Sequence, residues 1–542
     1  MESNQQWAAG SAAASPASLR RRTGPAGGAL RAVSAASLAC LALASAQAAE
    51  LDTGSDLKLR WDNTLKYSVG TRLSDPNALN LGAVNGDDAA RNFSKNDLIT
   101  NRAEFLSELD ARYHNFGFQL SAAGWYDAVY TGSTGNTSQA TFNPSSVPVG
   151  EFPDDVKKIA GRRIELRNAF ALGQFDVAGA PVAVRLGRHT VLWGESLYFT
   201  DNGIAAGMAP VDAYSALGVP SLQAKEVFMP TNQLSAAAIL GNFTLEGYYQ
   251  LEWRKTRIPP AGTFFSPVDL LDAGGERVFT PFGPSPRGAD QKPDKAQFGL
   301  ALKWRPDAFP VDFGLYALRY NDKTPSVVSS LTTGQYYLTY KEGIKMYGLS
   351  ATTTLGSTNL GAEVSYRQGV PLVTNTPALL LGGPPIDNSN PVYPVGDSVH
   401  YQLSAIYAGK AGWFWDNMSI AGEIGGHQLS RITANAANLD GTRDRHAFGM
   451  RGTLSFDYYQ VLPGLDLTVP LTVGYNPMGK SPISTAFNTY GSHRGADVTL
   501  GLTGVYALKY RGGLSVTRFY GKEAQNLYRD RSFATAYVSM SF

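Results

Sequence analysis

The sequence predicts an all-β fold, a transmembrane antiparallel β-barrel of about eighteen strands, with sixteen as the alternative count. Residues 56–72 alternate apolar and polar side chains, and similar alternation recurs to the end of the chain. The gaps between alternating segments are long and short in turn. No stretch after residue 50 reaches the roughly 18 apolar residues of a helical span, so only a closed barrel would pair every backbone group in hydrocarbon.

Composition limits the alternatives. The chain has 542 residues and a formal charge of +2, and only 17% of its residues are charged, against roughly 25% in soluble proteins. This weak net charge argues against nucleic-acid binding. The 57 glycines suit many turns, and the 27 tyrosines and 25 phenylalanines suit strand ends at a membrane interface. Because no linker divides the chain, residues 50–542 are predicted to form one domain.

Residues 1–49 are predicted to be a signal peptide. Arg20–Arg22 and Arg31 precede an apolar, alanine-rich stretch at 32–43, and small residues follow through Ala49. We expect the mature chain to begin between residues 47 and 50, with a transmembrane anchor as the alternative. Cys40, the only cysteine, falls in this segment, which excludes thiol catalysis and cysteine–zinc sites from the mature chain.

The strands follow from the alternation, taken in order. They are expected at 57–71, 98–113, 117–130, 162–172, 182–192, 233–240, 243–255, 295–305, 311–321, 343–354, 359–367, 398–408, 417–428, 445–457, 465–475, 495–508, 512–520 and 533–542. Gly241–Asn242 and Pro463–Gly464 are predicted hairpin turns. Short periplasmic turns, long external loops and an even strand count are typical of bacterial outer-membrane barrels.

The strand faces follow from the cost of charge in lipid. An Arg on the lipid face at mid-depth costs about 2–4 kcal/mol, so charged side chains should point into the lumen. In the second strand, Ile99 and Phe105 are therefore expected to face lipid. The predicted lumen-wall charges, which should largely neutralise one another, are Arg102, Glu104, Glu108, Arg163, Glu165 and Arg167. Their mixed signs argue against a strongly ion-selective pore.

Two inter-strand segments, 193–232 and 256–294, are expected to fold into the lumen as a plug or gate. An eighteen-strand barrel is wide enough to leave a channel unless something fills it, and these segments are rich in Gly, Pro and apolar residues. The candidate gate or lumen residues are Arg185, Arg188, Trp193, Glu195, Lys225, Glu226, Arg257, Phe264, Phe265 and Asp269. A constriction lined by Met208, Phe264, Phe265, Leu270 and Leu271 would favour a hydrophobic solute. The alternative is that both segments pack on one another outside the barrel.

Motifs of catalysis and metal binding are scarce. None of the six histidines has a metal-ligand spacing, and neither a phosphate-binding loop nor a serine elbow occurs. We therefore expect no enzyme activity, no cofactor and no metal site. The exception kept open is a barrel hydrolase, because His400, Gln402 and Ser404 share one strand face.

Several short motifs occur in a shared order. Arg185-Leu186-Gly187-Arg188 runs into Trp193-Gly194-Glu195-Ser196, and Lys225-Glu226, the 253–266 stretch, Glu363-Val364-Ser365-Tyr366-Arg367 and Asp530-Arg531 follow. Together they resemble the proteobacterial outer-membrane family known as domain of unknown function thirteen-oh-two, across essentially the whole mature chain. Val219-Pro220-Ser221 departs from the Pro-Gly of similar sequences. The resemblance implies a barrel in the outer membrane of a Gram-negative bacterium, associated with uptake or export of hydrophobic compounds.

The sequence therefore leads to one functional hypothesis and several alternatives. The hypothesis is a porin-like channel or transporter that passes a hydrophobic small molecule passively through a loop-constricted barrel. Its expected partners are outer-membrane lipids, that small molecule and the assembly machinery that reads the terminal Phe542. The alternatives are an outer-membrane partner of a lipid exporter, served by a periplasmic carrier or efflux pump, the hydrolase, and a general porin.

Overall fold

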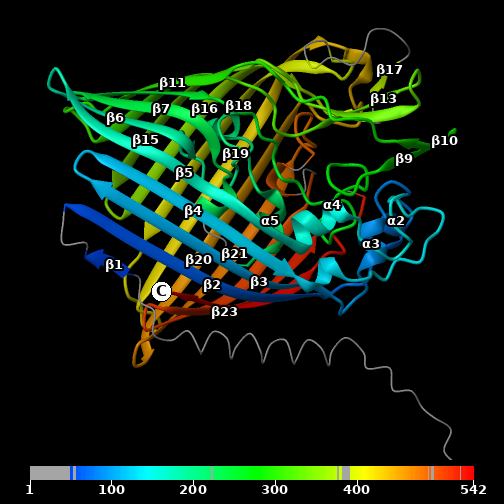
Figure 1. Ribbon diagram of the computed structural model, residues 1–542, viewed down its shortest axis with the longest axis horizontal. Coiled ribbons are helices and arrows are strands. Elements are labelled where there is room, and N and C mark those ends of the chain that lie inside the picture. Colours follow the sequence, from blue (N-terminus) through cyan, green and yellow to red (C-terminus); the bar gives the residue numbers. More distant parts are fainter. Residues whose placement is uncertain are drawn as a thin grey trace, which may run out of the picture. The chain divides into compact units, whose positions relative to one another are not determined.

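Eighteen antiparallel strands close into a barrel in the computed structural model, and a short strand, β1 (Ala49–Asp52), pairs with the first of them (Figure 1). The structure describes residues 49–52, 56–220, 224–374, 378–380, 388, 391–485, 487–489, 493–524 and 526–542. The barrel strands are β2 (Leu57–Arg72), β3 (Leu98–Tyr113), β4 (Phe116–Asp127), β5 (Arg162–Val177), β6 (Ala180–His189), β7 (Thr231–Leu240), β8 (Phe243–Gln250), β11 (Gln297–Trp304), β12 (Val311–Tyr320), β15 (Ile344–Leu355), β16 (Thr358–Pro371), β18 (Val395–Ala408), β19 (Asn417–Ala434), β20 (His446–Leu462), β21 (Leu465–Met478), β22 (Ala496–Tyr506), β23 (Tyr510–Tyr520) and β24 (Phe533–Ser541).

The barrel closes where its first and last strands meet. β2 pairs with β3 on one side and with β24 on the other, from Thr64 opposite Ser541 to Arg72 opposite Phe533. Closure leaves no barrel strand with an unpaired edge, which is the condition for a sheet in lipid. The predicted fold class and strand count are thus confirmed.

Each predicted strand overlaps one barrel strand, and both predicted hairpin turns lie where expected. Three predicted strands end three or more residues too late, because β4, β6 and β8 end earlier than the alternation does. At the end of β4 the Asp127 carboxylate accepts a hydrogen bond from the Val129 amide at 3.0 Å and starts the short helix η1 (Ala128–Thr131). Trp253 and Arg254, predicted to lie in a strand, follow the end of β8 and belong to a loop.

The long gaps contain short elements that the alternation did not reveal. The helices are α2 (Ala78–Leu81), α3 (Asp88–Asn92), α4 (Asp154–Val156), η2 (Lys157–Gly161), η3 (Ile204–Gly207), α5 (Ala213–Gly218), α6 (Ala224–Val227), η4 (Ala436–Asn438) and η5 (Phe487–Thr489). The strands are β9 (Arg277–Thr280), β10 (Gly283–Pro286), β13 (Ser326–Ser330), β14 (Gln335–Thr339) and β17 (Ala378–Leu380). Figure 1 shows α2, α3, α4, β9, β10, β13 and β17 gathered at one end of the barrel strands. Among the described residues, no helix has both the length and the apolar character needed to cross a membrane.

The outward face of the wall is apolar. Leu300, Leu315 and Leu349, on three neighbouring strands, are 58%, 52% and 52% exposed. Phe105 is also exposed, as predicted, but Ile99 is not. A β-bulge between Gly70 and Thr71 leaves Ile99 out of register, and its side chain joins a buried aromatic cluster.

Candidate functional site

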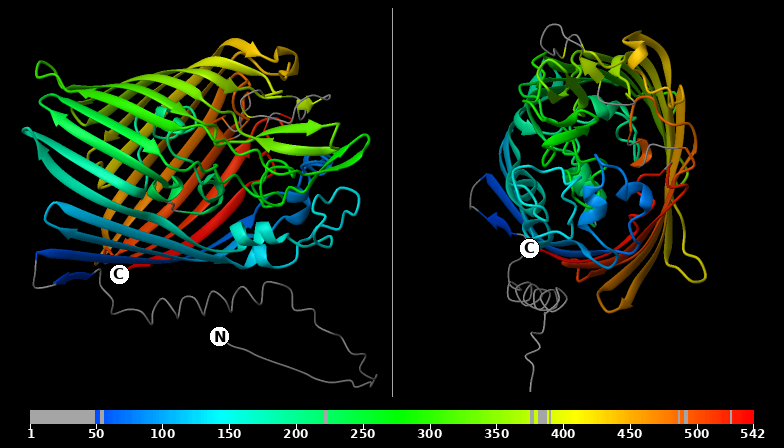
Figure 2. Two further views of the ribbon diagram at one scale, coloured as in Figure 1. Left: turned by 45° about the horizontal axis from the view of Figure 1, so that its top comes forward. Right: turned by 90° about the vertical axis from the view of Figure 1, so that its right-hand side faces the viewer.

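The described part of the segment between β6 and β7 includes η3 and α5. It runs inside the ring of strands (Figure 2). Such an inner segment must find partners for its backbone N–H and C=O groups, since an unpaired buried backbone group is costly. The partners come from inward-facing side chains of β16, β18 and β19. Within the first predicted lumen segment, 193–232, residues 195–204 therefore lie against the inner wall.

Glu363 on β16 holds the segment at two points. Its Oε2 atom accepts a hydrogen bond from the backbone N–H of Glu195 at 2.7 Å, and its Oε1 atom accepts one from Ile204 at 2.8 Å. One wall carboxylate thus binds two positions of the loop that are nine residues apart in the sequence. The Ser404 hydroxyl on β18 adds a bond of 3.0 Å to the Glu195 carbonyl. Burial raises the pKa of the Glu195 side chain above its ordinary value.

Glu423 on β19 binds the middle of the same loop. Its Oε2 atom accepts hydrogen bonds from three consecutive backbone amides, those of Leu197 at 3.2 Å, Tyr198 and Phe199 at 2.9 Å. A carboxylate that accepts several backbone N–H groups is a strong, charge-assisted partner. Two wall glutamates therefore bind five backbone amides of the loop.

Arg367, four residues after Glu363 on the same strand, binds the carbonyls of the loop. Its guanidinium donates hydrogen bonds to Asp201 at 3.1 Å, to Asn202 and to Gly203 at 2.9 Å. Opposite charges on one strand face thus recognise opposite ends of peptide groups in the loop. The Glu363-to-Arg367 motif and the Trp193-to-Ser196 motif meet here.

Two buried histidines and Asn202 form a further anchor. The Asn202 Oδ1 atom accepts from Nδ1 of His400 at 2.9 Å and from Nδ1 of His427 at 3.1 Å. The second ring nitrogens bond to hydroxyls, Nε2 of His400 to Ser398 at 2.9 Å and Nε2 of His427 to Ser481 at 2.7 Å. The network joins β18, β19 and the loop after β21 to the inner segment.

The side chains predicted for a hydrolase do not form a nucleophile–base pair. His400 is bonded to Ser398 rather than to Ser404, whose hydroxyl binds the Glu195 carbonyl. Ser398, His400 and Asn202 do repeat the order of a nucleophile, a base and an orienting group. All three side chains are buried, however, so an ester substrate could not reach the Ser398 hydroxyl.

Glycines on the wall make room for the segment. A Cβ atom on Gly348 would lie 2.8 Å from Cδ1 of Ile204, and one on Gly299 would lie 2.9 Å from the ring of Trp193. At Gly361 it would lie 2.9 Å from Cβ of Glu195. These distances are shorter than real Cβ contacts, so the segment approaches the wall this closely only where glycine is present.

Trp193 is the aromatic anchor of the segment. Its indole N–H donates to Oε2 of Glu246 on β8 at 2.7 Å. Its ring lies 5.2 Å from that of Tyr248 and 5.8 Å from that of Tyr316, within a cluster that also holds Met208. Trp193, predicted to lie in the lumen, is buried against β8 and β12.

Lys323 lies in the loop after β12, not in a wall strand, and it also binds the inner segment. Its ammonium donates to the Gly207 carbonyl at 3.0 Å and lies 5.2 Å from the ring centre of Tyr320. Burial lowers the pKa of Lys323 to about 8.

The second predicted segment, 256–294, begins with a buried ion-pair network. Arg257 pairs with Asp212 of the first segment at 2.6 Å and with Glu165 of β5. Glu165 also pairs with Arg163 at 2.9 Å and with Arg167 at 3.1 Å. The five side chains join both inner segments to the wall. On β2 and β3, Glu104 pairs with Arg102 at 2.9 Å and with Lys66 at 2.8 Å.

Phe264 and Phe265 lie in a buried aromatic cluster. Their ring centres are 4.8 Å apart, and Phe265 lies 5.3 Å from Phe533 of the last strand. Arg531 donates to the Phe264 carbonyl. The second segment is thus packed against the strand that closes the barrel.

The predicted constriction does not form. Phe264 and Phe265 belong to one cluster, Met208 to a second and Leu270 with Leu271 to a third. Four of the five side chains are buried, and Leu271 is partly buried against the cluster that contains Leu270. They are cores that hold the inner segments together, because apolar side chains gain more from packing on one another than from lining an aqueous passage.

Three other predicted residues lie on the wall away from these contacts. The Arg185 guanidinium lies 5.9 Å from the ring centre of Phe170, and Arg188 pairs with Glu252 at 3.3 Å. Glu108 lies half-buried on β3, opposite Ser121 of β4.

Of the remaining three predicted residues, Lys225 and Glu226 lie in α6 and Asp269 lies in a loop. The Glu226 carbonyl accepts a bond from Arg167 at 2.7 Å, and the Lys225 side chain lies outside the described residues. Asp269 is buried and accepts a bond from the Asp88 amide at 3.0 Å.

The whole barrel falls within one known protein family. A family model described as "Protein of unknown function (DUF1302)" matches residues 29–542. The chain belongs to this family. The match confirms the resemblance that the motifs indicated, and among curated proteins no relative was found.

Several solved structures are similar at low identity. Acinetobacter baumannii OccAB1 is 11% identical with a TM-score of 0.43, and the match covers 89% of this chain and 96% of that one. A BenF-like porin from Pseudomonas fluorescens Pf-5 is 10% identical with a TM-score of 0.41, over 90% and 98%. Pseudomonas aeruginosa OccK9 (OpdG) is 11% identical with a TM-score of 0.40, over 89% and 98%. Similarity this distant carries no information on substrate.

The residues that bind the inner segment were only partly visible in the sequence. Glu363 and Arg367 were noted as part of a motif but not as site residues, and Glu423, Asn202 and His427 were missed. The available signal was opposite charge at positions four apart on a strand that should face inward. A strand pattern does not say which distant loop such charges will meet.

Proposed function

We propose that this chain is an outer-membrane channel for hydrophobic small molecules, acting by passive passage and without a cofactor. The observation that carries the proposal is a closed barrel whose interior holds a segment bound to the wall by Glu363, Glu423 and Arg367. A closed barrel with an apolar outer face is suited to lipid. A segment that the wall binds only through non-covalent contacts can move away from the wall, as a gate requires.

Two further observations support an apolar solute. The inward carboxylates of Glu104 and Glu165 are each paired with two or more cations, so these parts of the wall hold no uncompensated negative charge that would attract a hydrated cation. On the outer face of β8, β11, β12, β15, β16 and β18 lies a depression of about 630 Å³, lined by side chains such as Leu300, Tyr347 and Val364. The depression is an apolar surface on the outside of the wall. Trp193 and Ile204 contact the inner side of the same strands.

We assign the gate to residues 193–209. The wall carboxylates Glu363 and Glu423 bind its backbone and hold it closed. Among the residues first predicted for this role, Trp193 and Glu195 lie in the gate itself. Phe264 and Phe265 lie in an aromatic core, Arg257 lies in a buried ion-pair network, and Asp269 is buried beside two other aspartates. The second segment is therefore a fixed plug in this proposal. Deleting it would remove core packing, so point variants give the cleaner test.

The test is uptake by Gram-negative cells, whose outer leaflet resists hydrophobic compounds. Cells that make the chain should take up a labelled alkane faster than cells with an empty vector, while uptake of a small sugar stays unchanged. Equal alkane uptake in both cell types would overturn the proposal, and faster sugar uptake would identify a general porin.

A cross-link tests the gate. Because the Cβ of Glu195 lies 2.9 Å from the place of a Cβ at Gly361, a Glu195→Cys, Gly361→Cys pair needs only a small shift to reach the roughly 3.5–4.5 Å of a disulfide. Oxidation should abolish alkane uptake and reduction should restore it. Full cross-linking without loss of uptake would show that residues 193–209 are not the gate.

The lipid-exporter alternative differs in direction. A partner of an exporter would receive lipid from a periplasmic carrier and move it outward. Loading cells with labelled alkane or lipid and measuring outflow, with and without the chain, separates the two, because passive entry predicts equal rates down either gradient.

A further inference from the structure

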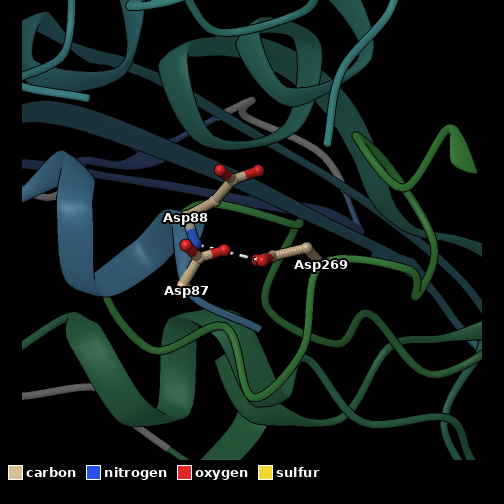
Figure 3. A group of neighbouring side chains, drawn as sticks. All are labelled: Asp87, Asp88 and Asp269. Carbon is tan, nitrogen blue, oxygen red and sulfur yellow. Dashed lines mark hydrogen bonds between the residues drawn. The ribbon is translucent and has the colours of Figure 1, made fainter. Parts of the chain in front are cut away.

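Three aspartates from two distant segments meet at the end of the barrel that carries the long loops. Asp87 and Asp88 lie at the start of α3, and Asp269 lies in the loop between β8 and β11. One carboxylate oxygen from each lies within 4.8 Å of the others. Figure 3 shows the Asp87 and Asp269 carboxylates facing one another. The exposed fractions of Asp87, Asp88 and Asp269 are only 0%, 2% and 0%.

Two of the carboxylate oxygens have no protein partner. Oδ1 of Asp87 and Oδ1 of Asp269 are buried and accept no hydrogen bond from any described residue. The other oxygens are occupied, since Asp87 Oδ2 accepts from Thr141 at 2.7 Å and from Arg91, and Asp269 Oδ2 accepts from the Asp88 amide at 3.0 Å. Buried polar atoms in native proteins are almost always paired, so these two oxygens indicate a missing partner.

The charges are also unbalanced. Three carboxylates face one ion-paired cation, Arg91, which leaves a formal charge of −3 + 1 = −2 in a buried place. Arg531 lies near Asp269 but its own contacts go to Asp530 and to the Phe264 carbonyl. A buried carboxylate without a counter-charge is strongly unfavourable.

We propose that this cluster is a calcium site that ties the loop after β2 to the loop after β8. A divalent cation would cancel the charge of −2 and would give the two free oxygens a partner. The donors are hard oxygens on side chains that hydrogen bonds hold in place, which suits Ca²⁺ with its tolerance for irregular oxygen shells. Mg²⁺ demands a regular octahedron with several waters, and Zn²⁺ favours nitrogen or sulfur ligands, which the cluster lacks.

The joint between the loops is already built around the cluster. The Asp269 amide donates to the Asn85 carbonyl at 2.9 Å, and the Asn143 amide donates to Asp88 at 3.0 Å. Asn136 adds a side-chain bond of 2.8 Å to Asp88. The carboxylates are therefore positioned before an ion arrives, which lowers the ordering cost of binding.

The experiment uses the full mature chain in detergent, stripped with a chelator and then titrated with CaCl₂. Calorimetry should show saturable binding, and the midpoint of thermal unfolding should rise with calcium, because a ligand that binds only the folded state stabilises it. MgCl₂ at equal ionic strength should raise the midpoint less. No rise with calcium in the wild-type chain, or an equal rise with magnesium, would overturn the assignment.

Two variants locate the site. Asp269→Asn should lose one calcium equivalent and the calcium-dependent rise. The matched control is Asp75→Asn, which changes an exposed aspartate in a loop, paired with Lys95 at 3.7 Å, and should keep both. If Asp269→Asn binds as much calcium as the wild-type chain, the site is not here. If it is more stable without calcium and the wild-type chain ignores calcium, shared protons replace the ion and the proposal falls.

Discussion

At the scale of single residues, the charged side chains of the wall bind the backbone of the inner segment. Glu363 and Glu423 accept from its amides, and Arg367 donates to its carbonyls. Inside a barrel the segment cannot complete a sheet of its own, so its peptide groups take partners from the strands. Charged partners are suited to this because their hydrogen bonds are about twice as strong as neutral ones.

Glu363→Gln should loosen the inner segment. The amide nitrogen of Gln cannot accept the bond that one carboxylate oxygen now accepts, and leaving a buried N–H without a partner costs about 1–3 kcal/mol. We expect faster proteolysis between residues 193 and 209 and a lower unfolding midpoint. Glu108→Gln, on a wall strand away from the segment, is the matched control. Equal proteolysis of both variants would show that Glu363 does not hold the inner segment.

Lys323 makes stability depend on pH in the alkaline range. Its pKa falls from the ordinary 10.5 to about 8 in the folded chain because it is buried. Between pH 8 and 10.5 the unfolded chain therefore holds a proton that the folded chain has lost, so this group adds stability as the pH rises through that range. From pH 8 to 10.5 the unfolding midpoint of the wild-type chain should rise relative to that of Lys323→Met. Parallel curves would contradict the assignment.

At the scale of elements, the inner segment and the wall fit because glycines replace side chains where they touch. Gly299, Gly348 and Gly361 lie beneath Trp193, Ile204 and Glu195. The wall and the segment therefore come into close contact at these three positions.

Gly348→Ala should displace η3. The new Cβ would lie 2.8 Å from Ile204, and overpacking a well-packed place typically costs about 1–3 kcal/mol. Gly422→Ala is the control, because its Cβ would meet only the Arg451 carbonyl at 4.0 Å. Unfolding midpoints of the two variants measure the difference, and a tolerated Gly348→Ala would show that the contact is loose.

At the scale of the whole molecule, the apolar outer face requires an apolar surrounding. Side chains such as Leu300, Leu315 and Leu349 are more than half exposed, and a continuous belt of this kind is unfavourable in water. The mature chain should therefore be monodisperse only in detergent or lipid and should aggregate when the detergent is removed. Light scattering before and after removal tests this, and a monodisperse chain in plain buffer would exclude a membrane barrel.

The strand order, the eighteen barrel strands and most of their faces could be predicted, because alternation is a local property of the chain. Where prediction failed, a local pattern met a tertiary constraint. Ile99 faces inward because a bulge shifts its register, and Trp253 leaves the sheet although the alternation continues. The five supposed constriction residues divide among three cores, since their burial depends on which distant segments they meet.

The sequence by itself determined that this chain closes into a barrel with apolar residues outside and charge inside, because a two-residue period is written in neighbouring positions. Only the tertiary structure decided that Glu363 and Arg367 bind residues 195–204, and that Asp269 meets Asp87 and Asp88. Those contacts join groups more than 150 residues apart, and their partners are fixed by the path of loops through the barrel, which no local pattern encodes.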